Sequence, residues 1–225
     1  MNKQGLLVEP KFTNANFYLQ SGEMTNITNN IKAMADKINC STDGKTLRKI
    51  ICWIHSNTVR LNSPNDKRKF KRTADEILLS KERTGCCDTA TLFTAIARAK
   101  GIPTMEIITF SKTWGKNVDI GMEKGTEGHF YAAAYVKDIN NKEGWVLINP
   151  DKYVTDEYAV KISYLNINDR NITDNFYSFA YVKDFRDVEV DGLKINSISN
   201  MGKIQKIAYM LCDRRDLHSK EEYER

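Results

Sequence analysis

The sequence has no apolar run that approaches the ~20 consecutive residues of a membrane-spanning helix. Its first residues, Met1 to Val8, also lack the apolar core of a secretion signal. We therefore expect a cytoplasmic protein without a membrane span. Hydrophobic residues make up 41% of the chain and charged residues 28%, values that are ordinary for globular proteins and that predict a buried core.

Metal ligands are also scarce. No two cysteines are spaced as CxxC, and the only histidines are His55, His129 and His218, so we expect no metal and no cofactor. Five cysteines are an odd number, so at least one stays unpaired within the monomer and a reducing compartment is favoured. Cys52 and Cys212 lie in apolar surroundings in the sequence and are predicted to be core residues.

The net charge of +5 is too small to indicate a nucleic-acid-binding protein. Its one local concentration is the basic run of residues 67–72, Lys-Arg-Lys-Phe-Lys-Arg. One interpretation of this run is a solvated loop, and the other is a basic rim that attracts an anionic partner to a nearby cleft. Phe70 is its only aromatic residue, which gives little basis for base stacking, so we expect no nucleic-acid partner.

Helical patterns precede strand patterns along the chain. Apolar residues at helical spacing predict helices over residues 27–38, 47–59, 74–79 and 86–100. Thr42 or Asp43 is the expected N-cap of the second helix, and Gly101 with Pro103 is expected to end the fourth. Runs of β-branched and aromatic residues predict strands over residues 105–110, 130–136 and 145–148. This order favours an α+β fold.

Between the first two strands, residues 111–127 contain several glycines and are predicted to form a mobile flap. After residue 165 the signals weaken to two short strands, at 179–182 and 188–190, and a last amphipathic helix from Met201 to Leu211. The sequence shows no repeat and no linker. We therefore expect one domain over residues 1–225, with a motif-bearing core at about 45–155 and a C-terminal extension at about 165–225.

Three segments carry residues suited to covalent catalysis. Cys86 follows Gly85 and opens a helix, where the positive end of the helix dipole favours a thiolate. His129 opens a predicted strand, and Asn149 follows another. A cysteine, a histidine and an asparagine can serve as nucleophile, base and orienter of that base. The pattern predicts a cysteine-dependent acyl-transfer enzyme.

These segments resemble the transglutaminase-like superfamily, whose members share a papain-like core. The resemblance covers residues 45–155 and has Asn149 where the family has aspartate. It implies a cysteine-bearing helix packed on an antiparallel sheet, with Cys86, His129 and Asn149 acting on a peptide or carboxamide carbonyl. The matching segments, in chain order, are Cys86-Cys87-Asp88-Thr89-Ala90-Thr91-Leu92-Phe93, Arg98, Gly101-Ile102-Pro103, Gly128-His129, and Trp145 through Asn149-Pro150.

Several assignments have alternatives. Cys87 adjoins Cys86, but the family register favours Cys86, and side chains of adjacent helical residues diverge by about 100°. Asp151 competes with Asn149 as the partner of His129. Each site residue also has a purely structural interpretation: an inert thiol, a hydrogen-bonded strand histidine, and a turn residue before proline.

The same chemistry has two outcomes. Water as acceptor makes the enzyme a protease or deamidase, and an amine acceptor makes it a cross-linking transglutaminase. By analogy with small members of the family we favour hydrolysis of a protein or peptide substrate, with a non-catalytic binding module as the rival. The backbone N–H of Cys86 is one expected oxyanion donor; Trp53 and Trp114 are weak candidates for the second.

Overall fold

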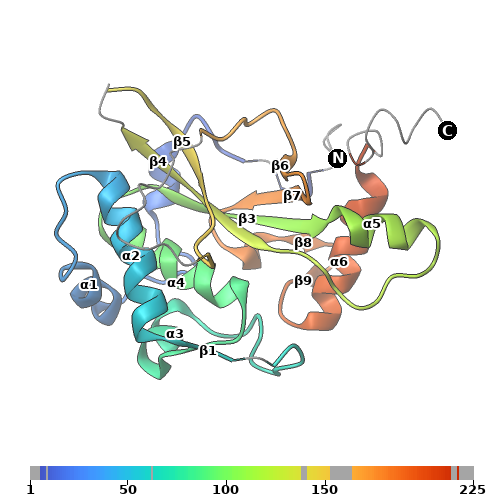
Figure 1. Cartoon of the computed structure of the whole chain (residues 1–225), viewed down its shortest axis with the longest axis horizontal. Coiled ribbons are helices and arrows are strands. Elements are labelled where there is room, and N and C mark those ends of the chain that lie inside the picture. Colours follow the sequence, from blue (N-terminus) through green and yellow to red (C-terminus); the bar gives the residue numbers. More distant parts are fainter. Residues whose placement is uncertain are drawn as a thin grey trace.

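A computed structural model describes residues 6–8, 10–61, 63–137, 141–152, 164–213 and 217. Its centre is a five-stranded sheet in the order β5-β4-β3-β7-β6, in which every neighbouring pair is antiparallel (Figure 1). The strands are β3 (Thr104–Ser111), β4 (Phe130–Lys137), β5 (Glu143–Ile148), β6 (Asn171–Thr173) and β7 (Phe176–Val182).

Helices surround this sheet, and most of them precede it in the chain. The α-helices are α1 (Asn29–Ala35), α2 (Asp43–Asn57), α3 (Ala74–Ser80), α4 (Cys86–Ala99), α5 (Lys112–Asp119) and α6 (Ile198–Leu211). The shorter elements are η1 (Ala15–Leu19), η2 (Phe185–Asp187), the parallel pair β1 (Val59–Arg60) and β2 (Glu82–Arg83), and the hairpin β8 (Glu189–Val190) and β9 (Leu193–Lys194). The predicted α+β fold is confirmed.

Both faces of the sheet are covered, which is why all eight residues of the central strand β3 are buried. One face packs on α4, with α1, α2 and α3 gathered behind it, while α5 and α6 lie towards the other end of the sheet (Figure 1). The opposite face packs against the N-terminal segment, where Leu6 and Tyr18 join the apolar side chains of Ile107, Trp145 and Tyr181.

Helix α4 is buried over twelve consecutive residues, Cys87–Arg98. It stops where the sequence predicted, because Gly101 takes the left-handed conformation (φ +79°) that glycine adopts without a steric penalty. The buried Arg98 then fixes the helix end: its Nε donates to the Thr104 carbonyl (2.8 Å) and its Nη2 to the Lys183 carbonyl (2.6 Å). The first residue of α4 is thereby held at a defined place beside the sheet.

The predicted flap at residues 111–127 is wrong over its first half, which forms α5. Trp114 is only 2% exposed, and its indole N–H donates to the Gly125 carbonyl (3.1 Å). A Cβ on Gly115 would lie 2.6 Å from the ring of Tyr209 in α6. The glycine at this position therefore permits close helix packing, and its presence does not signal a mobile backbone.

The other helix and strand expectations need smaller corrections. Thr42 is the N-cap of α2, its hydroxyl accepting from the Lys45 N–H (3.3 Å), but the helix ends at Asn57, so that Val59 lies in β1 and is 64% exposed. Cys52 is half-buried, whereas Cys212 is buried as predicted. The expectations for His218 and for the tail at 219–225 lie outside the described residues.

The segment after residue 165 contributes more to the sheet than its weak sequence signals indicated. Strand β7 pairs with the central strand β3, placing Tyr181 opposite Ile107. Within α6, Met201, Ile204 and Ala208 are buried as predicted, but Leu211 is exposed. The second predicted strand at 188–190 is the short β8.

Candidate active site

Cys86 is the first residue of α4, at the helix end where backbone N–H groups lack intrahelical partners. The loop in front of it is held by Asp88 in the first helical turn. The buried Asp88 carboxylate accepts from the Thr84 N–H (2.6 Å) and hydroxyl (2.8 Å) and forms an ion pair with Arg72. A carboxylate in the first turn also complements the helix dipole. Asp88 therefore ties the first turn of α4, which carries the Cys86 thiol, both to the preceding loop and to Arg72.

His129 lies immediately before β4, and its backbone is anchored to β3. Its N–H donates to the Thr109 hydroxyl (3.1 Å), and its carbonyl accepts from the same hydroxyl (2.9 Å). The preceding Gly128 has no room for a side chain, since a Cβ there would lie 2.2 Å from the Thr109 carbonyl oxygen. From α6, the buried Gln205 donates to that carbonyl (3.3 Å), so the C-terminal helix supports the same segment.

Asn149 follows β5, the antiparallel partner of β4. Their register places Ala132 opposite Ile148, so the residue before β4 and the residue after β5 leave the sheet at the same end. The side chains meet there: His129 Nε2 donates to Asn149 Oδ1 (2.9 Å). The Asp151 backbone N–H donates to the same oxygen (3.2 Å), which orients the amide towards the imidazole.

Burial by itself lowers the pKa of His129. The interaction with the Cys86 side chain, the Asn149 hydrogen bond and the Asp151 charge outweigh burial, so the pKa of His129 is raised above its ordinary value. The effect of Cys86 on this pKa indicates that the thiol lies close to the imidazole. A raised pKa favours the imidazolium. The ring also packs edge-on against Tyr131, with centroids 4.6 Å apart.

The Asp151 carboxylate points to other partners. It forms ion pairs with the buried Arg83 (3.3 Å) and with Arg60, and it accepts from the Thr89 hydroxyl (2.9 Å). Arg83 in turn donates to Thr58 at the end of α2 (2.6 Å). Of the two predicted partners of His129 after β5, Asn149 is the one whose side chain contacts the imidazole. Asp151 instead belongs to a network that ties this turn to α2 and α4.

His55 in α2 supports the turn from behind: its Nε2 donates to the Pro150 carbonyl (2.9 Å). Burial lowers the pKa of His55, although the Pro150 carbonyl and Asp151 oppose this effect. Sequence reasoning found no role for His55, because no motif surrounds it. The side chain holds the segment between Asn149 and Asp151.

Cys87 faces the core. It is 1% exposed, in the apolar cluster that contains Phe70 and Phe130. Burial, with a smaller contribution from Asp88, raises the pKa of this thiol well above its usual value, and the charge of Lys69 opposes the shift. Cys87 therefore stays a neutral thiol in the core behind the site.

An open cleft of about 380 Å³ lies over Cys86. A cavity of this size falls within the range of small-ligand sites. Neither Trp53 nor Trp114 is among its lining residues, and the Trp114 indole N–H is already bonded to Gly125. The described lining residues are Arg60, Leu61, Ser63, Pro64, Lys69, Thr84, Gly85, Cys86 and Gly128.

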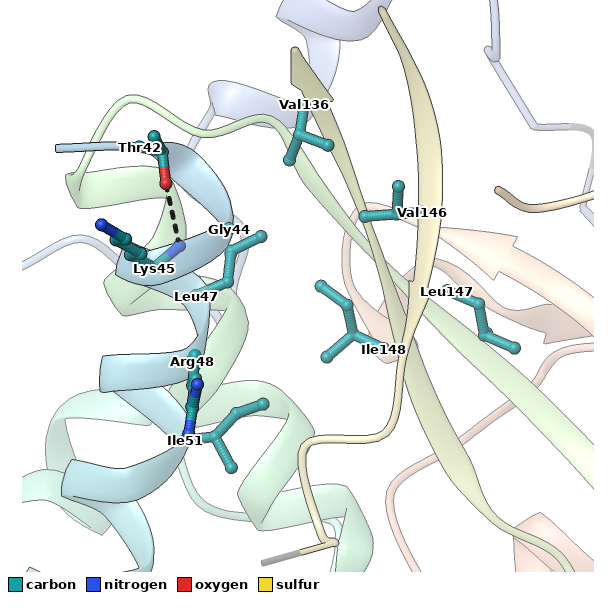
Figure 2. Close-up of a pocket in the computed structure, with 10 residues that line it drawn as sticks. All are labelled: Thr42, Gly44, Lys45, Leu47, Arg48, Ile51, Val136, Val146, Leu147 and Ile148. Atoms are coloured by element: carbon teal, nitrogen blue, oxygen red, sulfur yellow. Dashed lines mark hydrogen bonds between the residues drawn. The ribbon is translucent and has the colours of Figure 1, made fainter. Parts of the chain in front are cut away.

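A second cavity, of about 240 Å³, lies between α2 and the strands β4 and β5. Figure 2 shows Leu47 and Ile51 pointing from α2 towards Val146 and Ile148 across this space. It contains none of the three predicted site residues, and its walls are predominantly apolar, whereas the cleft described above lies over Cys86. Within the described part of the chain, no group of three or more His, Cys, Asp or Glu side chains is arranged to hold a metal ion.

Comparisons with known proteins bear on the family and the fold. A model of the transglutaminase-like superfamily matches residues 32–150, more than half of the chain. Among solved structures, a candidate cysteine protease from Cytophaga hutchinsonii superimposes with a TM-score of 0.53 at 15% identity, a likeness that concerns the fold. The match covers 79% of this chain and 50% of that protein, so this chain spans about half its length. A search of curated proteins finds no match. For the described residues, no helix combines the length and apolar character that a bilayer crossing requires.

Proposed function

Because this chain belongs to the transglutaminase-like superfamily, we propose that it is a cysteine-dependent hydrolase that attacks a peptide or carboxamide carbonyl through Cys86, His129 and Asn149. One observation carries the proposal: the imidazole of His129 is hydrogen-bonded to Asn149, and the nearby Cys86 thiol raises the pKa of the same imidazole. A base held between a nucleophile and an orienter is the arrangement of a cysteine–histidine–asparagine triad.

In the first half-reaction, His129 takes the thiol proton and the Cys86 sulfur adds to the carbonyl carbon. The oxyanion that forms lies at the start of α4, where the Cys86 backbone N–H can donate to it. His129 then gives its proton to the leaving amine or ammonia, and a thioester remains on Cys86. In the second half-reaction, His129 deprotonates a water, the water displaces the sulfur, and the carboxylic acid and the free thiol are formed.

Asn149 acts on the imidazole alone in this scheme. Its oxygen accepts from Nε2, which leaves Nδ1 towards the thiol and so selects the tautomer and ring orientation that the reaction needs. A neutral amide stabilises the imidazolium less than a carboxylate does. Cys86 and the nearby Asp151 charge both raise the pKa of His129, and so supply part of the stabilisation of the imidazolium that a neutral Asn149 does not give.

Water is proposed as the acceptor by analogy with the structural neighbour, which is named as a candidate cysteine protease. The test separates the two acceptors. Glutamine-containing peptides and an unfolded protein substrate are incubated with and without a fluorescent primary amine. Hydrolysis predicts acid products whose yield does not depend on the amine. Incorporation of the amine as the main product would instead identify a transglutaminase.

Labelling with iodoacetamide followed by mass mapping tests the nucleophile without a substrate. Cys86 is expected to be alkylated much faster than the other four cysteines, and His129→Ala is expected to slow this labelling while the fold is retained. Cys87→Ala is the matched control, because it removes the adjacent thiol without touching the site. Fast labelling of Cys87 with Cys86 unmodified would contradict the assignment.

A further inference from the structure

We propose that Lys69 recognises a carboxylate on the substrate, next to the carbonyl that Cys86 attacks, so that acidic peptides are the preferred substrate class. The proposal rests on the function proposed above. It makes Lys69 a specificity-determining residue of the cleft, one that binds substrate and takes no part in the exchange of protons or the acyl group.

The residues of the basic run 67–72 differ in their partners and in their position relative to the cleft. Arg68 is paired with Asp66 (2.8 Å) and Glu82 (2.6 Å), and Arg72 is buried in its ion pair with Asp88. Lys67 is exposed and is not among the described residues that line the cleft. Lys69 is the one member of the run that the structure places in that lining.

The position of Lys69 is fixed by the residue that follows it. Phe70 is buried with a φ of +63°, a left-handed conformation that is costly for a bulky residue. Its ring packs against Phe130 and Phe185, with centroids 5.9 and 6.2 Å away, and this packing holds the backbone in place. A costly conformation held next to a cleft residue is typical of functional sites.

The Lys69 side chain lies over the glycine that precedes the nucleophile. A Cβ built on Gly85 would be 3.3 Å from Lys69 Cε and 3.8 Å from Nζ. Among the described residues, the ammonium makes one hydrogen bond, a long one of 3.4 Å to the Pro64 carbonyl. A carbonyl acceptor does not neutralise the charge. Within the described part of the chain, the cleft therefore presents a half-buried cation without a carboxylate partner, beside the glycine that precedes Cys86.

The other charges near the cleft do not cancel this cation. Of the described lining residues none is acidic, and the one further cation, Arg60, is paired with Asp151. Asp88 and Asp66 are engaged by Arg72 and Arg68. A concave site with charge of one sign concentrates ligands of the opposite sign. An ammonium is a point charge without the fork geometry of arginine, so it accepts a carboxylate from several directions.

The first test compares two alkylating agents of similar size, anionic iodoacetate and neutral iodoacetamide, at Cys86. The ratio of their rates, normalised to the ratio for free β-mercaptoethanol, is expected to fall about fourfold in Lys69→Gln, which is the loss of the attraction between unit charges about 5 Å apart in water. Lys67→Gln, which removes the same charge a short distance along the chain, should leave the ratio unchanged. Added salt should lower the ratio in the wild type and have little effect in Lys69→Gln.

The second test uses matched peptides, with glutamate or glutamine beside the attacked residue, and with a free or amidated C-terminus. A preference for the internal acid or for the free terminus identifies the source of the carboxylate, and either preference should be lost in Lys69→Gln. Normal iodoacetamide labelling of Cys86 with a rate ratio that Lys69→Gln does not change overturns this inference alone. Absence of labelling at Cys86 overturns the proposed function beneath it.

Discussion

Asp151→Ala is expected to destabilise the protein strongly, although Asp151 lies outside the proposed triad. The Asp151 carboxylate is the counter-ion of Arg83 and also accepts from Thr89. The side chains of Asp151 and Arg83 are 5% and 4% exposed. Burial lowers the pKa of Arg83, and the Asp151 charge is the largest effect that opposes this shift. Without Asp151, the Arg83 guanidinium stays buried with hydroxyl partners, and the weaker charge effect of Asp88 is left to oppose burial.

The magnitude follows from burial. Removing one partner of a buried ion pair costs about 3–5 kcal/mol, because the remaining charge is left uncompensated. The second ion pair of Asp151 adds little, because the Arg60 side chain is 48% exposed and such exposed pairs contribute about 0–1 kcal/mol. A destabilisation of 1 kcal/mol lowers the Tm of a chain of this size by about 2–4 °C. Asp151→Ala should therefore lower the Tm by roughly 6–20 °C.

Thermal unfolding followed by circular dichroism measures this effect. Arg60→Ala is the matched control, because it removes only the exposed ion pair of Asp151 and leaves the buried pair with Arg83. Arg60→Ala should lower the Tm by less than about 4 °C. The Asp151→Ala variant keeps the backbone N–H that orients Asn149, so below its Tm the labelling of Cys86 should persist. If Asp151→Ala and Arg60→Ala shift the Tm equally little, the argument from the buried charge of Arg83 is refuted.

Three further outcomes are expected. Cys86→Ala should lower the pKa of His129 measured by NMR titration, because it removes the Cys86 side chain whose interaction raises this pKa; an unchanged pKa would show that the two side chains do not interact. Gly115→Ala should destabilise the protein, because the added methyl group would lie 2.6 Å from the Tyr209 ring, and an unchanged Tm would contradict that packing. Cys87 should react with iodoacetamide only under denaturing conditions, because its side chain is buried. If Cys87 in the folded protein is labelled as fast as the exposed Cys40, it lies outside the core.

The elements around Cys86 could be predicted from the sequence because their signals are local. A glycine before Cys86, apolar spacing through α4 and a glycine stop at residue 101 lie within a single stretch of chain. The strands before and after the site were likewise marked by continuous apolar and β-branched runs. Membership of the transglutaminase-like superfamily was predictable for the same reason, since each of its motifs is a short contiguous pattern.

The functions of individual polar and glycine residues depended on distant partners. Gly115 was interpreted as part of a flap because its contact, Tyr209, lies in a helix far along the chain. The basic run allowed either a solvated loop or a rim near a cleft, but its sequence did not indicate that Lys69 would line the cleft while Arg72 would be buried against Asp88.

The sequence by itself therefore determined the order of helices and strands, the family, and the residue types available for catalysis. Only the tertiary structure decided which of Asn149 and Asp151 faces the imidazole. That choice depends on Arg83, which binds the Asp151 carboxylate and leaves the Asn149 amide to His129. The physical reason is that neighbouring residues in the sequence set the local backbone conformation. A buried charge, in contrast, pairs with the opposite charge that tertiary packing brings next to it, and that residue can be far away in the sequence.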